Sequence, residues 1–126
     1  MTEQRTGKAT AELFEQVIHR RLGARDPDVL VGPQHGVDVG VVRVADGVVI
    51  ALTADPVFVV PAYGWERAAW FAAHILASDA STSGLPLRWM AIDLNLPPEI
   101  TDEELTALWD AFHVACEQMG IAVVTG

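Results

Sequence analysis

Two valine-rich runs separated by Asp46 and Gly47 constrain the fold of this chain more than any other feature. The runs cover about residues 37–44 and 48–54, and apolar side chains recur at every second position along much of their length. Alternation of this kind is typical of half-buried strands, and Asp-Gly between two such runs is a strong signal for a tight turn. The sequence therefore predicts an antiparallel β-hairpin.

Three helices are predicted, one before this hairpin and two after it. Apolar residues recur at helical spacing in residues 10–22 and again in residues 65–76. The second of these segments is apolar nearly all round, which predicts deep burial. Thr101 and Glu104 form the capping-box pattern at the start of a third helix, and Gly120 is its expected end.

The remaining segments complete a mixed fold. Two prolines and two glycines in residues 24–36 indicate a loop. Residues 87–96 alternate as a strand with Met90 and Ile92 on one face, and residues 121–126 begin a further strand. The order helix, hairpin, helix, strand, helix, strand predicts an α+β domain. We expect a four-stranded, largely antiparallel sheet with helices packed on one face.

The composition is that of a globular domain with an acidic surface. With 51% hydrophobic and 20% charged residues, the chain of 126 residues has ample apolar material for one core. Eight Lys and Arg against 17 Asp and Glu give a formal net charge of −9, so we expect no nucleic acid as a partner.

No apolar stretch is long enough to span a bilayer and no signal-peptide core is visible, which predicts a cytoplasmic protein without membrane contact. The single cysteine, Cys116, fits core packing.

Two aspartates lie at the outer ends of the predicted hairpin, where the turn cannot use them. Asp38 starts the first strand and Asp55 ends the second, so antiparallel pairing brings both to one edge of the sheet. A third, Asp79, lies at the expected end of the helix that begins near residue 65. Carboxylates brought together repel one another unless a cation lies between them, and Mg²⁺ prefers such oxygen ligands. Each aspartate taken alone is more simply explained by a turn or helix-end role.

Four motifs in order carry a resemblance to a known family. "VGPQHGVDVGVVRV", "LTADP", "HILASDASTSGLPLRWM" and "GIAVVTG" resemble the N-terminal domain of the aminoimidazole ribonucleotide synthase (PurM-like) superfamily. The family pattern has an aspartate in a strand after a glycine-rich approach, a Thr-Asp-Pro strand end, and Asn-Asp at a helix end. The resemblance covers about residues 10–126. Its "LTADP" and "GLPLRWMAIDLNLPPEITDEEL" segments look closest to the hydrogenase maturation factor and thiamine monophosphate kinase.

The resemblance implies a Mg²⁺-ATP-binding domain over residues 1–126. Carried over by motif, Asp38, Asp55 and Asp79 would be the metal ligands, and Ser78 and His35 would lie near the nucleotide. The implied chemistry is ATP-dependent phosphorylation or activation of a small substrate, in which metal ions neutralise developing phosphate charge. Family members dimerise through this domain by pairing two four-stranded sheets into a barrel-like core.

Two further expectations concern the surface. Lys8 is a candidate phosphate contact or part of a solvated tail, and the candidates for an apolar outer face are Val39, Val41, Val49, Ala51, Met90 and Ile92.

Departures from the family pattern keep other interpretations open. Val37 stands where the family often has a second acidic residue, and Ser78 replaces the asparagine before Asp79. The expected Gly-His-Thr continuation is missing at Gly126, so we expect a fragment without its C-terminal domain that is inactive alone. One alternative is a non-catalytic homodimerising module of the same fold with a decayed nucleotide site. Another is an unrelated α+β domain without such a site.

Overall fold

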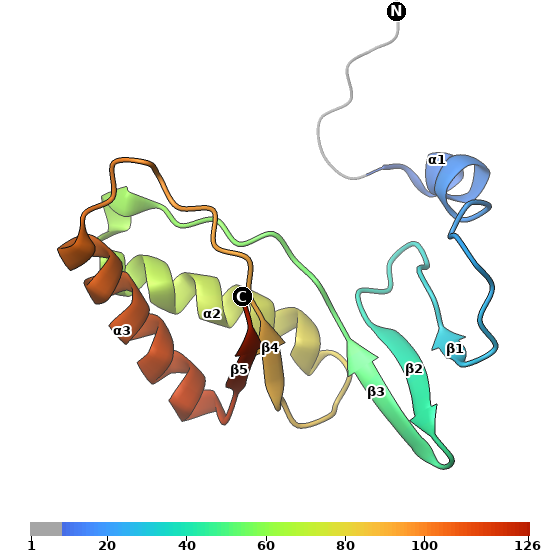
Figure 1. The fold of residues 1–126 in the computed structure, drawn as a ribbon. Coiled ribbons are helices and arrows are strands. Elements are labelled where there is room, and N and C mark those ends of the chain that lie inside the picture. The colour runs from blue at the N-terminus through green and yellow to red at the C-terminus, as the bar shows by residue number, and fades with distance from the viewer. Residues whose placement is uncertain (1–8) are drawn as a thin grey trace, which may run out of the picture. The chain divides into compact units, whose positions relative to one another are not determined.

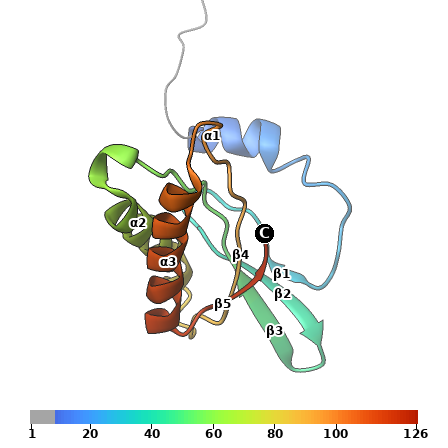
Figure 2. The ribbon, with the colours of Figure 1, turned by 60° about the vertical axis from the view of Figure 1, so that its left-hand side comes forward.

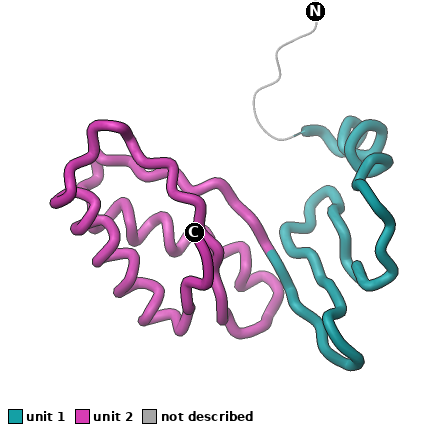
Figure 3. Tube along the Cα trace, in the orientation of Figure 1, with its two compact units in different colours: residues 1–52 teal, residues 53–126 magenta. Residues whose placement is uncertain are grey.

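The computed structural model describes residues 9–126, and the chain divides into two compact units, Met1–Leu52 and Thr53–Gly126 (Figure 3). The first unit contains a short helical segment and three strands, and the second contains two long helices and two strands (Figure 1). The candidate Lys8 lies outside the described residues. Of the helices in residues 9–126, none combines the length and the apolar composition of a membrane span.

The first unit is built on the predicted hairpin. Strands β2 (Gly40–Ala45) and β3 (Val48–Leu52) pair antiparallel, with Val41 opposite Ala51. Gly47 joins them with φ +69°, a conformation that costs glycine little and other residues more. This part of the fold is confirmed as predicted, because the turn and the alternation are local signals.

A third strand pairs with the hairpin where the sequence predicts only a loop. Strand β1 (Val29–Val31) lies beside β2 in the order β1-β2-β3, with Val29 opposite Val42. The prediction of a loop over residues 24–36 is therefore wrong for these three residues. A half-exposed ion pair fixes the approach to β1, because Arg43 donates from Nη2 to Asp28 Oδ1 at 2.8 Å.

The N-terminal helical segment is shorter than the predicted helix over residues 10–22. It consists of α1 (Ala11–Leu13) and a π-helical turn, η1 (Phe14–Ile18). Thr10 caps it by accepting from the Leu13 amide at 3.2 Å. After Ile18 the Arg21 guanidinium donates to the Val17 carbonyl at 2.9 Å, which satisfies a carbonyl of the last turn.

The second unit encloses the core. Helices α2 (Trp65–Ser81) and α3 (Asp102–Met119) pack against each other beside strands β4 (Trp89–Ala91) and β5 (Ala122–Thr125) (Figures 1 and 2). A short 3-10 turn, η2 (Pro61–Tyr63), precedes α2. Met90 in β4, Ile92 directly after it and Ile121 directly before β5 belong to the same buried cluster as residues of the two helices. The buried cluster consists of Ala69, Ala72, Ala73, Met90, Ile92, Leu108, Phe112, Ala115, Cys116 and Ile121.

The capping box predicted for α3 is present in full. The Thr101 side chain accepts from the Glu104 amide at 3.2 Å, and the Glu104 carboxylate accepts from the Thr101 amide at 3.0 Å. Gly120 ends the helix in the left-handed conformation, with φ +70°. Local chemistry therefore fixed both ends of α3, as the sequence predicted.

Helix α2 departs from the prediction in two ways. It continues to Ser81 instead of ending near residue 76, and hydroxyl groups bond to its last carbonyls: Thr82 Oγ1 donates to the Asp79 carbonyl at 2.7 Å and Ser83 Oγ donates to the Ala80 carbonyl at 2.8 Å. Deep burial on all sides is also wrong. The alanines face the core, whereas the large side chains Trp70 and Ile75 are each 48% exposed. Small residues allow α3 to approach closely on one side and leave the other side open.

The expected single four-stranded sheet is wrong. The described strands form a three-stranded antiparallel sheet, β1-β2-β3, and a separate two-stranded sheet in which β4 and β5 are parallel. Parallel strands need a crossover connection, and α3 provides it. Met90 and Ile92 are correctly placed on one face of their strand but belong to the core, so they are not part of an apolar outer face. No closed barrel forms within residues 9–126.

Candidate functional site

Asp38 and His35 lie in the first unit, in the segment that leads into β2. A turn stabilised by the Val37 amide, which donates to the Gln34 carbonyl at 3.3 Å, carries His35, and Gly36 adopts φ +79° within it. The His35 ring meets the Phe14 ring edge-on, with centroids 6.4 Å apart. Both His35 and Asp38 are exposed, so a ligand in solvent can reach them.

Asp55 lies at the start of the second unit, three residues after β3 ends at Leu52. It is half-buried in an irregular segment whose side chains alternate in exposure. Val57 and Val59 pack against the core cluster and hold this segment to the second unit. Within the hairpin, Leu52 pairs with Gly40, so the start of β2 does lie beside the end of β3 as predicted.

Asp79 and Ser78 lie in the last turn of α2, so Asp79 is at the end of this helix as predicted. Ser78 is exposed and Asp79 is half-buried. The Asp79 backbone carbonyl accepts from the Thr82 hydroxyl at 2.7 Å, which fixes the helix end around it. The Asp79 carboxylate lies near the negative end of the helix dipole.

The three aspartates are divided between the two units. Asp38 belongs to the first, and Asp55 and Asp79 belong to the second. Across residues 9–126, no three His, Cys, Asp or Glu side chains gather closely enough to hold a metal ion. The chemistry of the donor set nevertheless fits Mg²⁺, because all three are carboxylates with oxygen donors, and Mg²⁺ commonly completes its shell with water and substrate phosphates.

A groove between α2 and α3 is a second candidate site, lying wholly within the second unit. It has a volume of about 460 Å³ and is walled by Trp70, with Glu66 and Asp110 among its lining residues. The His74 ring stacks on the Trp70 indole with the ring centroids 3.9 Å apart, and His74 Nδ1 lies 2.7 Å from the Trp70 carbonyl oxygen. These two contacts hold the indole in place. The sequence analysis predicted deep burial for helix α2 and did not identify the groove. The signal was present in Glu66 and Trp70, which are four residues apart on one helix face.

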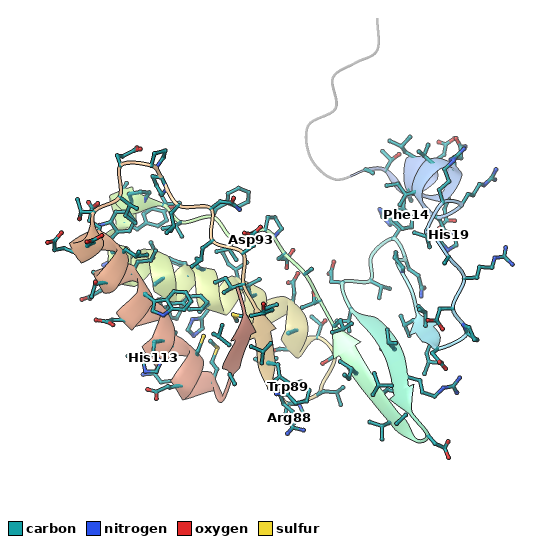
Figure 4. The ribbon with its side chains drawn as sticks, in the orientation of Figure 1. Phe14, His19, Arg88, Trp89, Asp93 and His113 are labelled. Atoms are coloured by element: carbon teal, nitrogen blue, oxygen red, sulfur yellow. The ribbon has the colours of Figure 1, made fainter. Side chains whose placement is uncertain are left out.

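Two further aromatic contacts involve residues that are labelled in Figure 4, and the first of them shares Phe14 with His35. In the first unit the Phe14 and His19 rings stack with centroids 6.1 Å apart. In the second unit the Arg88 guanidinium lies 4.7 Å from the centre of the Trp89 ring, a cation–π contact at the start of β4. Trp65 and Trp109 pack against the core cluster, whereas Trp89 is 57% exposed.

Cys116 is not a candidate nucleophile. It is only 3% exposed and belongs to the core cluster, as the sequence predicted. Burial raises the pKa of the Cys116 thiol, because desolvation disfavours the charged thiolate. The neutral thiol therefore persists at physiological pH and serves packing.

Comparison with known proteins gives one match. The family model described as AIR synthase related protein, N-terminal domain, matches residues 36–126, which is well over half of the chain. The matched range includes Asp38, Asp55, Ser78 and Asp79, while His35 lies one residue before it. No curated protein and no solved structure matches the chain significantly.

Proposed function

The chain belongs to the AIR synthase related family, in which it represents the N-terminal domain, and we propose from this that it binds ATP together with Mg²⁺. The observation that carries the proposal is the extent of the match, since residues 36–126 include all three aspartates in their motifs. Within the superfamily, we propose that the hydrogenase maturation factor and thiamine monophosphate kinase are its nearest relatives. The domain would then be part of an ATP-dependent enzyme that phosphorylates or activates a small substrate.

Asp38, Asp55 and Asp79 would hold the metal ion in this proposal. Bound there, Mg²⁺ supplies charge neutralisation for the phosphates, which otherwise meet a protein with a net charge of −9. The exposure of Asp38 and the partial exposure of the other two residues support this proposal, because solvent reaches all three. Ser78 and His35 are the proposed contacts at the rim of the nucleotide site.

Calorimetric titration with ATP in the presence and absence of Mg²⁺ tests this site. We expect binding that requires Mg²⁺ and that weakens at least about tenfold in an Asp55→Asn variant, because one charged ligand is lost. Asp46→Asn is the matched control, since Asp46 lies in the hairpin turn and outside the proposed site. Equal binding by the two variants, or binding without Mg²⁺, contradicts the proposed ligand set.

We also propose that two copies pair through the sheet of the first unit. No side chain of residues 9–52 is buried, and Val49 is 46% exposed. Val41, Val49 and Ala51 share one face of the hairpin, because Val41 lies opposite Ala51 and side chains alternate along each strand. A second copy of the same face would cover these residues and remove a partly exposed apolar surface.

Sedimentation or light scattering of a Val41→Glu variant tests the pairing. We expect the wild-type chain to be a dimer and the variant to be a monomer, since a carboxylate would be buried without a partner. Val42→Glu is the control, because Val42 is the next residue on β2 and faces the other side of the sheet. A dimer that survives Val41→Glu excludes this face as the interface.

A non-catalytic homodimerising module is the second candidate function. Val37 and Ser78 depart from the family pattern at the two positions beside proposed metal ligands. A dimer that shows no heat with Mg²⁺-ATP would favour this candidate over the first.

A further inference from the structure

The groove between α2 and α3 lies among small and apolar side chains. Ala107, Ala111 and Ala115 line it from α3 at intervals of four residues, so they follow one ridge of that helix. Val114 and Trp70, each 48% exposed, stand beside this row. Such a surface resembles the seat of another helix, because small residues allow close approach and the larger side chains supply contact area.

The charged residues of the groove are both acidic. Glu66 and Asp110 line it from opposite helices, and Gln118 is its only other polar residue. Over their full lengths α2 and α3 together carry seven carboxylates and one arginine, Arg67. A ligand that covers this groove therefore gains from positive charge beside its apolar surface.

We propose that the α2–α3 groove binds an amphipathic helix of a partner protein, with an apolar stripe flanked by lysine or arginine. The apolar stripe would lie on Ala111 and against the Trp70 indole, which the stacked His74 ring keeps in position. The flanking cations would meet Glu66 and Asp110. This site rests on the second unit alone and is independent of the proposed nucleotide site.

A synthetic peptide serves as the probe. A helix of about five turns, with leucine and alanine on one face and lysine on the other, is labelled and titrated with the full chain. We expect a dissociation constant on the order of micromolar, and no binding of a matched peptide that has glutamate for lysine. Amide shifts in an NMR titration should concentrate on α2 and α3 near Trp70 and Asp110. Absence of binding, or shifts concentrated elsewhere, overturns the proposal.

Two pairs of variants separate a specific site from general attraction to an acidic protein. Asp110→Lys should weaken the lysine peptide at least about tenfold, while Asp46→Lys, the same charge change in the hairpin turn, should weaken it less than about twofold. Trp70→Ala should weaken binding by a similar factor, and Trp89→Ala should not, although both tryptophans are about half exposed. Circular dichroism checks that each variant is folded. Equal losses within either pair overturn the proposal.

Discussion

The two units of this chain differ in whether they enclose a core. In the second unit, two helices and two strands bury ten residues in one cluster, and Ala69 and Ala73 are completely inaccessible. In the first unit, three strands with a well-defined register bury no side chain of residues 9–52. A hairpin can be specified by its turn and alternation alone, but its stability needs a covered apolar face. We therefore expect stability to come from the second unit and self-association from the first.

The largest expected difference concerns apolar truncation in the two units. Phe112 is 3% exposed within the core cluster, so Phe112→Ala should lower the free energy of unfolding by about 3–5 kcal/mol. Val49→Ala removes a half-exposed side chain from the first unit and should cost less than about 1 kcal/mol at concentrations where the chain is monomeric. Urea denaturation followed by circular dichroism measures both. Similar losses for the two variants would break the contrast between the units.

Helix caps give an intermediate effect with a matched pair. Thr101 and Thr10 each accept from a helix amide at 3.2 Å, in the second and the first unit respectively. Thr101→Ala should lower the free energy of unfolding by about 1 kcal/mol, because α3 packs into the core. Thr10→Ala should leave it unchanged, since neither α1 nor η1 contributes a buried residue. A loss from Thr10→Ala as large as that from Thr101→Ala would show that the N-terminal segment contributes to global stability.

Thiol chemistry gives a smaller effect that depends on pH. Because burial raises the pKa of Cys116, the native thiol should react with a thiol reagent much more slowly than a cysteine introduced by Val49→Cys on the exposed sheet. The unfolded chain loses the thiol proton first, so this group's contribution to stability is complete below about pH 8.5 and is lost as pH rises through the raised folded pKa.

Stability measured from pH 8 to pH 10 checks the sign of that contribution. The free energy of unfolding of the wild-type chain should fall more steeply with pH than that of a Cys116→Ala variant. Parallel curves would mean that burial does not affect the titration of Cys116.

The smallest expected effect concerns the ion pair of the first unit. Arg43 and Asp28 side chains are each nearly half exposed, so solvent screens their attraction. Asp28→Asn should lower the free energy of unfolding by at most about 0.5 kcal/mol. Adding salt should change the free energy of unfolding of the variant little, because the variant lacks the ion pair that salt would screen. A loss above about 1 kcal/mol would show that this pair, and not a second copy, supplies the missing stability of the sheet.

Local signals in the sequence predicted the parts of the fold that depend on neighbouring residues. The Asp46–Gly47 turn and the Thr101–Glu104 capping box both formed as expected, since each is complete within a few residues. Pairing between distant strands could not be predicted in this way. Parallel pairing of β4 with β5 depends on how α3 packs, and β1 is only three residues long.

At the candidate site, the sequence likewise predicted which residues are involved but not how they are arranged in space. The three aspartates were chosen by motif, and the family match includes each of them. Their expected association at one sheet edge rested on hairpin pairing, which holds for Gly40 and Leu52 but stops before Asp38 and Asp55. The groove on α2 was missed because an alanine-rich helix was expected to be buried on all sides, whereas Trp70 is exposed.

Hydrogen exchange at two protein concentrations, measured by mass spectrometry on the full chain, tests most directly whether the first unit depends on a second copy. Association stabilises the segments at the interface by mass action, so amides of β1, β2 and β3 should become more protected as concentration rises. Amides of α2 and α3 should keep the same protection, because their core is complete in one copy. Protection of β2 and β3 that does not change with concentration would contradict the account.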